Sequence, residues 1–348
     1  MTKRLTSTLA VTTLGLLILA ASVIQPAAEA PIERSLCIYD PLGANGFLYQ
    51  SFDTYVIQAR EWGIDFERIP YTEEAVAASD FKSGRCDAVI MTGIRTINFV
   101  KFAGSLDMAG GLQTYDQLRM AIRIMSSPKA AQYMATEDYS VIGIVPYGKA
   151  FLMARQREWL EGLNTMAGHK IAVMSYDHQA VTLAKVFGLS PVGASIATFG
   201  PMFNNGAVDL AYAPGWAFEA MELYKGLGDE GGISDFVLGI LTGQIMIHKD
   251  RFPDELAQKS RTWVLENMYD QVLRWVKDAE QNIPQKYWVH LEGEKEQQYR
   301  AMFRKTRQRL WEQNWYSHKM QTLLKKVRCK TNPGLAECSM NTEGGPVR

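Results

Sequence analysis

The sequence predicts an α/β protein of two lobes that close like a hinged clamshell. Short apolar segments alternate with helical patterns in residues 36–93 and again in residues 170–214. A long β-rich passage, GGISDFVLGILTGQIMIHKD, follows and is predicted to cross back to the first lobe. We expect a signal peptide at 1–30, lobe I at 31–145 plus 236–255, lobe II at 146–235, bracing helices at 256–328 and a tail at 329–348.

The start of the chain has the order of a secretory signal peptide. Lys3 and Arg4 precede the apolar run LAVTTLGLLILAASVI, and the small residues of PAAEA follow it. An uncleaved membrane anchor is the alternative, but the run is short for a spanning helix and is interrupted by Thr and Gly. We therefore expect cleavage near Ala28–Ala30 and a periplasmic protein.

The overall composition is that of a soluble globular protein. The chain has 348 residues, of which 47% are hydrophobic and 21% charged, and its formal net charge is zero. A neutral balance gives no reason to expect nucleic acid as a partner.

The expected elements follow in order along the chain. In the first series, LCIYD, DFERIPY and CDAVIMTG are strand-like, whereas FDTYVIQAREWG and EEAVAASDFKSG are helical. The segment YSVIGIVPYGKAFLMA predicts two apolar strands around a Pro-Tyr-Gly turn. The second series consists of KIAVMSY (strand), HQAVTLAKVFG (helix), a short SIATFG segment and VDLAYAP (strand).

Beyond Phe252 the pattern is helical. Apolar residues recur at four-residue steps on one helix face, at Val264, Met268, Val272 and Val276. Residues 295–328 contain ten Lys and Arg against two Glu. We expect a solvated helical surface here rather than a docking patch.

Because we expect export to an oxidising compartment, we interpret the four cysteines as two disulfides. Cys329 and Cys338 bracket KTNPGLAE, whose Asn-Pro-Gly favours a turn. Cys37 lies in the first predicted strand and Cys86 at the start of a later one. We expect Cys37–Cys86 and Cys329–Cys338 among three possible connectivities, with buried free thiols as the alternative for the first pair.

Motifs for catalysis, metals and cofactors are missing from the sequence. The turn GANG at residues 43–46 is neither G-x-G-x-x-G nor a P-loop, and no G-x-S-x-G is present. The five histidines show no metal-ligand spacing. We expect no catalytic residue, metal or cofactor, although a hydrolase with a triad assembled from distant residues stays open.

Polar and aromatic residues gather where the predicted strands end. Ligands of such folds lie outside the carboxyl ends of parallel strands, where these side chains supply stacking faces and hydrogen-bond partners. The ligand-binding candidates are Asp40, Asn45, Tyr71, Thr92, Arg95, Tyr147, Tyr176, Asp177 and Trp216.

Several segments of the chain carry a family resemblance. Among them are CIYDPLGANG, FKSGRCDAVIMTGIR, FAGSLDMAGGL and FNNGAVDLAYAP between Cys37 and Lys277, and KKVRCKTNP follows near the end of the chain. In these segments the chain resembles the DctP-type solute receptors of tripartite ATP-independent periplasmic (TRAP) transporters, in particular the AdeT-like branch. The resemblance implies a type II periplasmic-binding fold that traps a small molecule without chemistry and delivers it to a membrane permease. An exported binding or sensory protein without a permease is the alternative. Ligand identity and oligomeric state stay open.

The resemblance also bears on ligand charge. An arginine of these receptors pairs with the ligand carboxylate, but the matching segment MAGHKIAV has Ala172 at that position. Asp40 and Asp177 are expected at the cleft, and aromatic faces attract cations. We therefore expect a neutral or cationic ligand; the alternative is that Arg95 or Arg155 replaces the arginine.

Measuring the mass of the intact protein checks signal-peptide removal and disulfide formation together. Periplasmic protein should lack roughly the first 28–30 residues and lie about four hydrogens below its fully reduced mass. The Cys37–Cys86 closure should stabilise the fold by roughly 2–4 kcal/mol. Four alkylatable thiols in protein taken from the periplasm would contradict the disulfides.

Overall fold

The strands of the computed structural model form one mixed sheet. The model describes residue 2 and residues 30–347, so nearly all of the predicted signal peptide lies outside the described residues. The strands are β1 (Ile32–Tyr39), β2 (Ile64–Tyr71), β3 (Ala88–Thr92), β4 (Tyr139–Ala154), β5 (Lys170–Met174), β6 (Ser190–Ala194), β7 (Leu210–Pro214), β8 (Gly232–His248) and β9 (Trp288–Val289). Their order is β2-β1-β3-β8-β4-β7-β5-β6, and β9 pairs with β8.

Two parallel groups of strands flank a long antiparallel pair. Strand β1 pairs in parallel with β2 and β3, and β5 pairs in parallel with β6 and β7. Strand β8 runs antiparallel to β3, and β4 runs antiparallel to both β7 and β8. The predicted crossing of the β-rich passage back to the first group is therefore confirmed.

The prediction of two strands around residues 146–148 is wrong. Strand β4 is one strand of 16 residues, paired with β8 from Tyr139↔His248 to Ala154↔Gly232. The register shifts between Pro146 and Gly148, where Gly148 has a φ of +124°. A bulge thus absorbs the Pro-Tyr-Gly segment, and the strand continues in the same direction.

Strand β6 was not predicted. Its sequence, SPVGA, contains residues that are depleted in strands, and it lies at the edge of the sheet, where Pro191 is tolerated. The SIATFG segment opens a helix, because the Ser195 side chain accepts a hydrogen bond from Thr198 N and completes a capping box.

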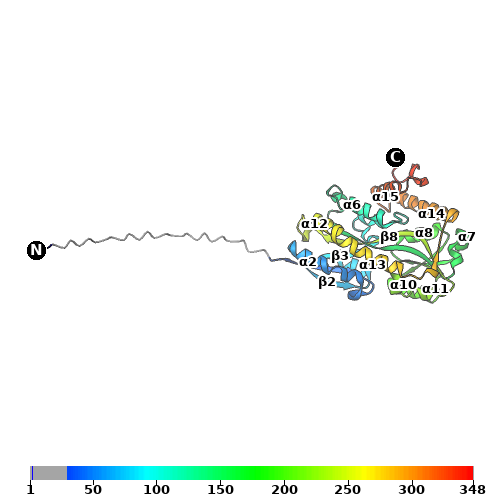
Figure 1. Ribbon diagram of the computed structural model, residues 1–348, viewed down its shortest axis with the longest axis horizontal. Coiled ribbons are helices and arrows are strands. Elements are labelled where there is room, and N and C mark those ends of the chain that lie inside the picture. The colour runs from blue at the N-terminus through cyan, green and yellow to red at the C-terminus, as the bar shows by residue number, and fades with distance from the viewer. Residues whose placement is uncertain (1, 3–29, 348) are drawn as a thin grey trace. The chain divides into compact units, whose positions relative to one another are not determined.

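The helices cover the sheet in two sets. Helices α12 and α13 pack on β4, whereas α14 packs on α8 and α15 on α6 (Figure 1). The row Val264, Met268, Val272 and Val276 is buried, as predicted.

The helices are α1 (Phe47–Ser51), α2 (Asp53–Glu61), α3 (Glu74–Lys82), α4 (Gly93–Thr96), α5 (Lys101–Gly104), α6 (Tyr115–Met125), α7 (Leu163–Met166), α8 (His178–Val186), α9 (Ile196–Asn204), α10 (Ala217–Ala220), α11 (Tyr224–Leu227), α12 (Leu256–Trp263), α13 (Tyr269–Gln281), α14 (Gly293–Glu312) and α15 (His318–Thr331). Within the described part of the chain, none is long and apolar enough to span a bilayer.

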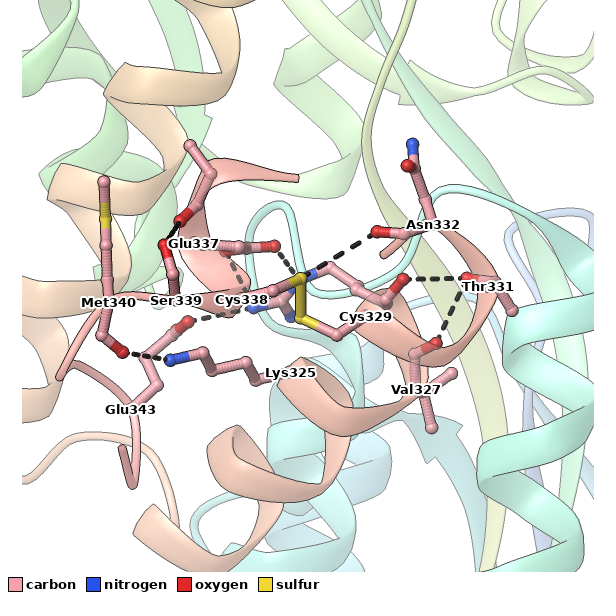
Figure 2. The surroundings of a disulfide bond; sticks show 12 residues. Lys325, Val327, Cys329, Thr331, Asn332, Glu337, Cys338, Ser339, Met340 and Glu343 are labelled. Atoms are coloured by element: carbon pink, nitrogen blue, oxygen red, sulfur yellow. Dashed lines mark hydrogen bonds and ion pairs between the residues drawn. A yellow bond between two sulfur atoms is a disulfide. The ribbon is translucent and has the colours of Figure 1, made fainter. Parts of the chain in front are cut away.

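Both predicted disulfides are confirmed. Cys37 in β1 joins Cys86 just before β3, with their Cα atoms 5.9 Å apart. Cys329 in α15 joins Cys338, with a Cα–Cα distance of 5.6 Å, and ties the tail to this helix (Figure 2).

The basic segment is not wholly a solvated surface, because two of its arginines lie in a buried ionic cluster. The Arg328 guanidinium contacts Glu337 Oε1 at 2.6 Å and Glu343 Oε2 at 2.9 Å, and Arg307 pairs with the same two glutamates at 2.5 and 2.7 Å. Both arginine side chains are only 3% exposed. Burial opposes ionisation of Glu337, but the two guanidinium groups overcome it and lower its pKa to about 2.

A third basic residue of the segment, Lys325, also points inward. Its Nζ donates hydrogen bonds of 2.8 Å to the carbonyl oxygens of Met340, Thr342 and Gly345. Figure 2 shows this side chain reaching from α15 to the tail beside the disulfide. Three kinds of interaction thus hold the tail: the disulfide, the ionic cluster and the hydrogen bonds of Lys325.

Removing one charge of the cluster should be costly. Glu343→Gln leaves buried guanidinium charge uncompensated, so we expect the free energy of unfolding to fall by roughly 3–5 kcal/mol. Urea denaturation followed by circular dichroism measures it. Lys326→Met, at an exposed neighbour on α15, is the control and should change it by less than about 0.5 kcal/mol. Equal effects of the two variants would contradict a stabilising cluster.

Candidate functional site

A pocket of about 70 Å³ lies at the carboxyl ends of both parallel groups. We call it the strand-end pocket. Residues at or after the ends of β1, β2, β3, β5 and β7 line it, together with the middle of β4. Its polar and aromatic lining consists of Tyr39, Glu74, Thr92, Tyr147, Tyr176, Asp177, Phe199, Tyr212 and Trp216, and apolar side chains form the rest. Such a position is where open α/β sheets bind their ligands.

Glu74 connects the two sides of the pocket. It is 3% exposed, at the start of α3, and its Oε1 accepts a hydrogen bond from Thr92 N at 2.7 Å. Its Oε2 accepts one from the Tyr176 hydroxyl, also at 2.7 Å. The carboxylate therefore links the end of β3 to the loop after β5.

Arg95 lies next to this pair. Its Nε is 3.7 Å from Glu74 Oε2, and its guanidinium carbon lies 3.4 Å from the centroid of the Tyr176 ring. Glu74 and the ring both stabilise the guanidinium, because each presents negative charge or a negative π-face to it. The charge of Arg95 is thus balanced within the protein.

Asp177 is the second buried carboxylate of the pocket, at 2% exposure. Its Oδ1 accepts a hydrogen bond from Ala180 N at the start of α8, and its Oδ2 accepts one from the Tyr212 hydroxyl, both at 2.9 Å. Burial raises the pKa of Asp177 to about 6, although these hydrogen bonds oppose the shift. No ion-pair partner of Asp177 occurs among the described residues.

Aromatic side chains complete the walls. The Trp216 indole donates to the Tyr147 carbonyl oxygen at 2.8 Å, and the two ring centroids are 5.1 Å apart. Burial raises the pKa of the Tyr147 hydroxyl well above 10, so it is a neutral hydrogen-bonding group at neutral pH. Thr92 Oγ1 is buried and finds no hydrogen-bond partner in the part of the chain that the structure describes. A buried group of this kind favours a polar ligand.

The structure brings most of the predicted binding residues together. Thr92, Tyr147, Tyr176, Asp177 and Trp216 line the strand-end pocket, and Arg95 contacts Tyr176. Their roles in ligand binding stay predictions.

Three other candidates lie outside the lining. The Asp40 carboxylate accepts hydrogen bonds from Leu42 N and Tyr49 N, which is the role of a turn and helix cap. Asn45 is exposed, and the Tyr71 hydroxyl donates to Asp80. These contacts give Asp40 and Tyr71 local structural roles.

The position of the expected arginine lies in the core. Ala172 is 0% exposed in β5, on the same strand face as Met174, which lines the pocket. Arg155 donates to the Phe203 carbonyl oxygen at 2.9 Å and is not part of the lining. Arg95 is not part of the lining either, but it contacts two residues that are, Glu74 and Tyr176.

Sequence reasoning missed Glu74, Tyr39 and Tyr212. A signal for Glu74 was present, because it shares a helix face with Ala77, Ala78 and Phe81 at i+3, i+4 and i+7. A carboxylate on a buried face requires partners and so indicates a polar site. Among the described residues, no group of three or more metal-ligating side chains is placed to hold a metal ion.

Comparison with known proteins identifies relatives along most of the chain. The family model of Solute-binding protein AdeT 1/2 matches residues 60–343. The chain is similar to Probable solute-binding protein AdeT1 of Acinetobacter baumannii, with 37% identity over 88% of this chain and all of the relative. AdeT2 of the same organism is 22% identical over 68% of this chain and 99% of its own length.

Solved structures share the fold. A TRAP periplasmic solute-binding protein of Ralstonia eutropha, with bound (S)-2-acetolactate, has a TM-score of 0.67 at 14% identity, covering 86% of this chain and 99% of that one. The periplasmic ectoine-binding protein of a Halomonas elongata TRAP transporter gives the same four values. The predicted two-lobed periplasmic-binding fold is thus confirmed, and the family consists of binding proteins rather than enzymes. The chain belongs to the AdeT 1/2 solute-binding protein family.

Proposed function

We propose that the protein is a periplasmic receptor that traps a small polar ligand in the strand-end pocket and delivers it to a TRAP-type permease. The observation that supports this most is the set of buried polar groups from both parallel groups around one pocket. In this proposal, lobe I (31–145 plus 236–255) and lobe II (146–235) close over the ligand, helices 256–328 brace them, and the signal is removed near Ala28–Ala30.

The charges of the site favour a cationic ligand over a simple dicarboxylate. The site has two buried carboxylates, Glu74 and Asp177, and one guanidinium nearby, that of Arg95, which lies 3.7 Å from Glu74. A buried carboxylate without a cation is costly to ionise, so a ligand ammonium near Asp177 would offset that cost. The aromatic walls add to the attraction for a cation.

A thermal-shift screen of organic acids, amino acids, sugars and amines tests ligand class. We expect amines or amino compounds to raise the melting temperature, and Asp177→Asn to abolish the rise. Asp229→Asn, at an aspartate whose side chain is 98% exposed, is the control and should keep it. If only carboxylates stabilise the protein, and Arg95→Ala removes the effect while Asp177→Ala does not, then Arg95 is the carboxylate clamp and the ligand is an acid.

Binding should also depend on pH. Because burial raises the pKa of Asp177 to about 6, the side chain takes up a proton below that value and loses the charge that would attract a cation. The affinity for an amine identified in the screen should therefore fall by about tenfold for each pH unit below about 6. Titration calorimetry between pH 4.5 and 8 measures it. The Asp177→Asn variant should bind the amine weakly, with an affinity that does not change with pH. If its affinity falls with pH as steeply as that of the wild-type protein, Asp177 is not the group that titrates.

A further inference from the structure

A second cavity of about 70 Å³ adjoins the strand-end pocket. We call it the apolar chamber; β4, β8 and α8 form most of its walls, through Leu152, Leu238, Leu183, Ala184 and Phe187. Four residues line both cavities: Ile94, Asp177, Tyr212 and Leu241. The hydrogen-bonded pair of Asp177 and Tyr212 therefore forms part of the partition between the two cavities.

The apolar chamber has one further carboxylate, Asp107, which is 4% exposed. Thr242 donates to it from its backbone N at 2.9 Å and from its hydroxyl at 2.5 Å. Burial raises the pKa of Asp107 to about 8, so this side chain is mostly protonated at neutral pH. The chamber thus presents mainly hydrocarbon walls, one mainly neutral acid and the Gln179 amide, which is hydrogen-bonded to Ala109 N, the Asp107 carbonyl oxygen and the Tyr316 hydroxyl. The charged acid lies at the partition.

This arrangement suits a molecule with one charged end. An ammonium group at the partition would lie beside Asp177, and an alkyl or aryl substituent would extend between Leu152 and Phe187. A carboxylate at the same place would meet the negative charge of Asp177. A second ammonium in the chamber would lose its hydration next to Leu183 and Leu238, and its one acidic neighbour, Asp107, is mostly protonated.

We infer that the two cavities form one site for a small amphipathic monoamine, whose ammonium group lies at Asp177 and whose apolar substituent fills the chamber. The inference rests on the proposed receptor function and narrows its ligand class. In this inference the chamber selects for the length of the apolar substituent, because its walls are hydrocarbon from Leu152 to Phe187. Transfer of hydrocarbon into such a space is favourable by roughly 0.8 kcal/mol per methylene, about fourfold in affinity.

Titration calorimetry at pH 7.5 with n-alkylamines from methylamine to hexylamine tests the inference on the whole mature protein. The dissociation constant should fall about threefold to fourfold per added methylene until the chamber is filled. Hexanoate and 1,6-diaminohexane should each bind at least about tenfold more weakly than hexylamine, because one brings a negative charge and the other a second charge. Equal affinity across the series, or preference for hexanoate or the diamine, would overturn it.

Two substitutions in one helix test whether the alkyl group of the ligand binds in the chamber or the protein binds hydrophobic molecules nonspecifically. Ala184→Met places extra side-chain volume in the chamber and should weaken hexylamine at least about tenfold more than ethylamine. Val186→Met in the same helix lies outside both linings and should preserve the wild-type chain-length preference. If both variants keep the wild-type dependence of affinity on chain length, the alkyl group does not bind in the chamber and the inference is wrong.

The outcomes also distinguish the inference from the proposed function. If a non-amine solute binds and Asp177→Asn or Glu74→Gln weakens it while the alkylamines show no chain-length trend, the receptor function stands and the inference falls. If neither the amines nor any solute of the wider screen binds, both fall. Should Ala184→Met fail to fold, the chain-length series of the wild-type protein still decides the question.

Discussion

The antiparallel pairing of β4 with β8 is the constraint on which the rest of the structure depends. The pairing runs for almost the full length of both strands, and its two ends hold different partners. Strand β3 attaches to the C-terminal end of β8, and β7 attaches to the C-terminal part of β4. The two parallel groups are thereby fixed to one hydrogen-bonded pair, and their carboxyl ends meet around the mid-strand residue Tyr147. The pocket follows from the register of these strands.

Much of the fold could be predicted from the sequence because apolar residues recur with clear helix and strand periods. Alternating strand and helix patterns identified both parallel groups, and the four-step row ending at Val276 identified the face of α13 that packs on the sheet. The cysteines were paired correctly: one pair brackets a turn, and the other joins Cys37 of β1 to Cys86 just before β3, the strand that pairs with β1. The periodic patterns and the bracketed turn are local signals, which a single sequence carries.

The failures share a physical cause, which is that tertiary contacts override local preference. Pro146 and Gly148 favour a turn, but β8 supplies partners on both sides of them and the chain continues as a strand. At the site, strand ends identified Thr92 and Asp177, whereas Glu74 escaped because its partners come from segments 18 and 102 residues away. Arg307 and Arg328 were assigned to the surface because their glutamates lie in the tail, outside the helical pattern.

The ionic cluster at the tail has a consequence for a distant part of the fold. Arg307 and Arg328 donate to the carbonyl oxygens of Gly110 and Gly111, each at 2.9 Å, while Glu337 and Glu343 neutralise the same guanidinium groups. The segment at Gly110 and Gly111 is therefore held by arginines whose charges are balanced only by residues of the tail. Without Glu337 and Glu343, the two guanidinium groups would be uncompensated charges in the interior. Loss of the tail would therefore destabilise the Gly110–Gly111 segment as well as the tail itself.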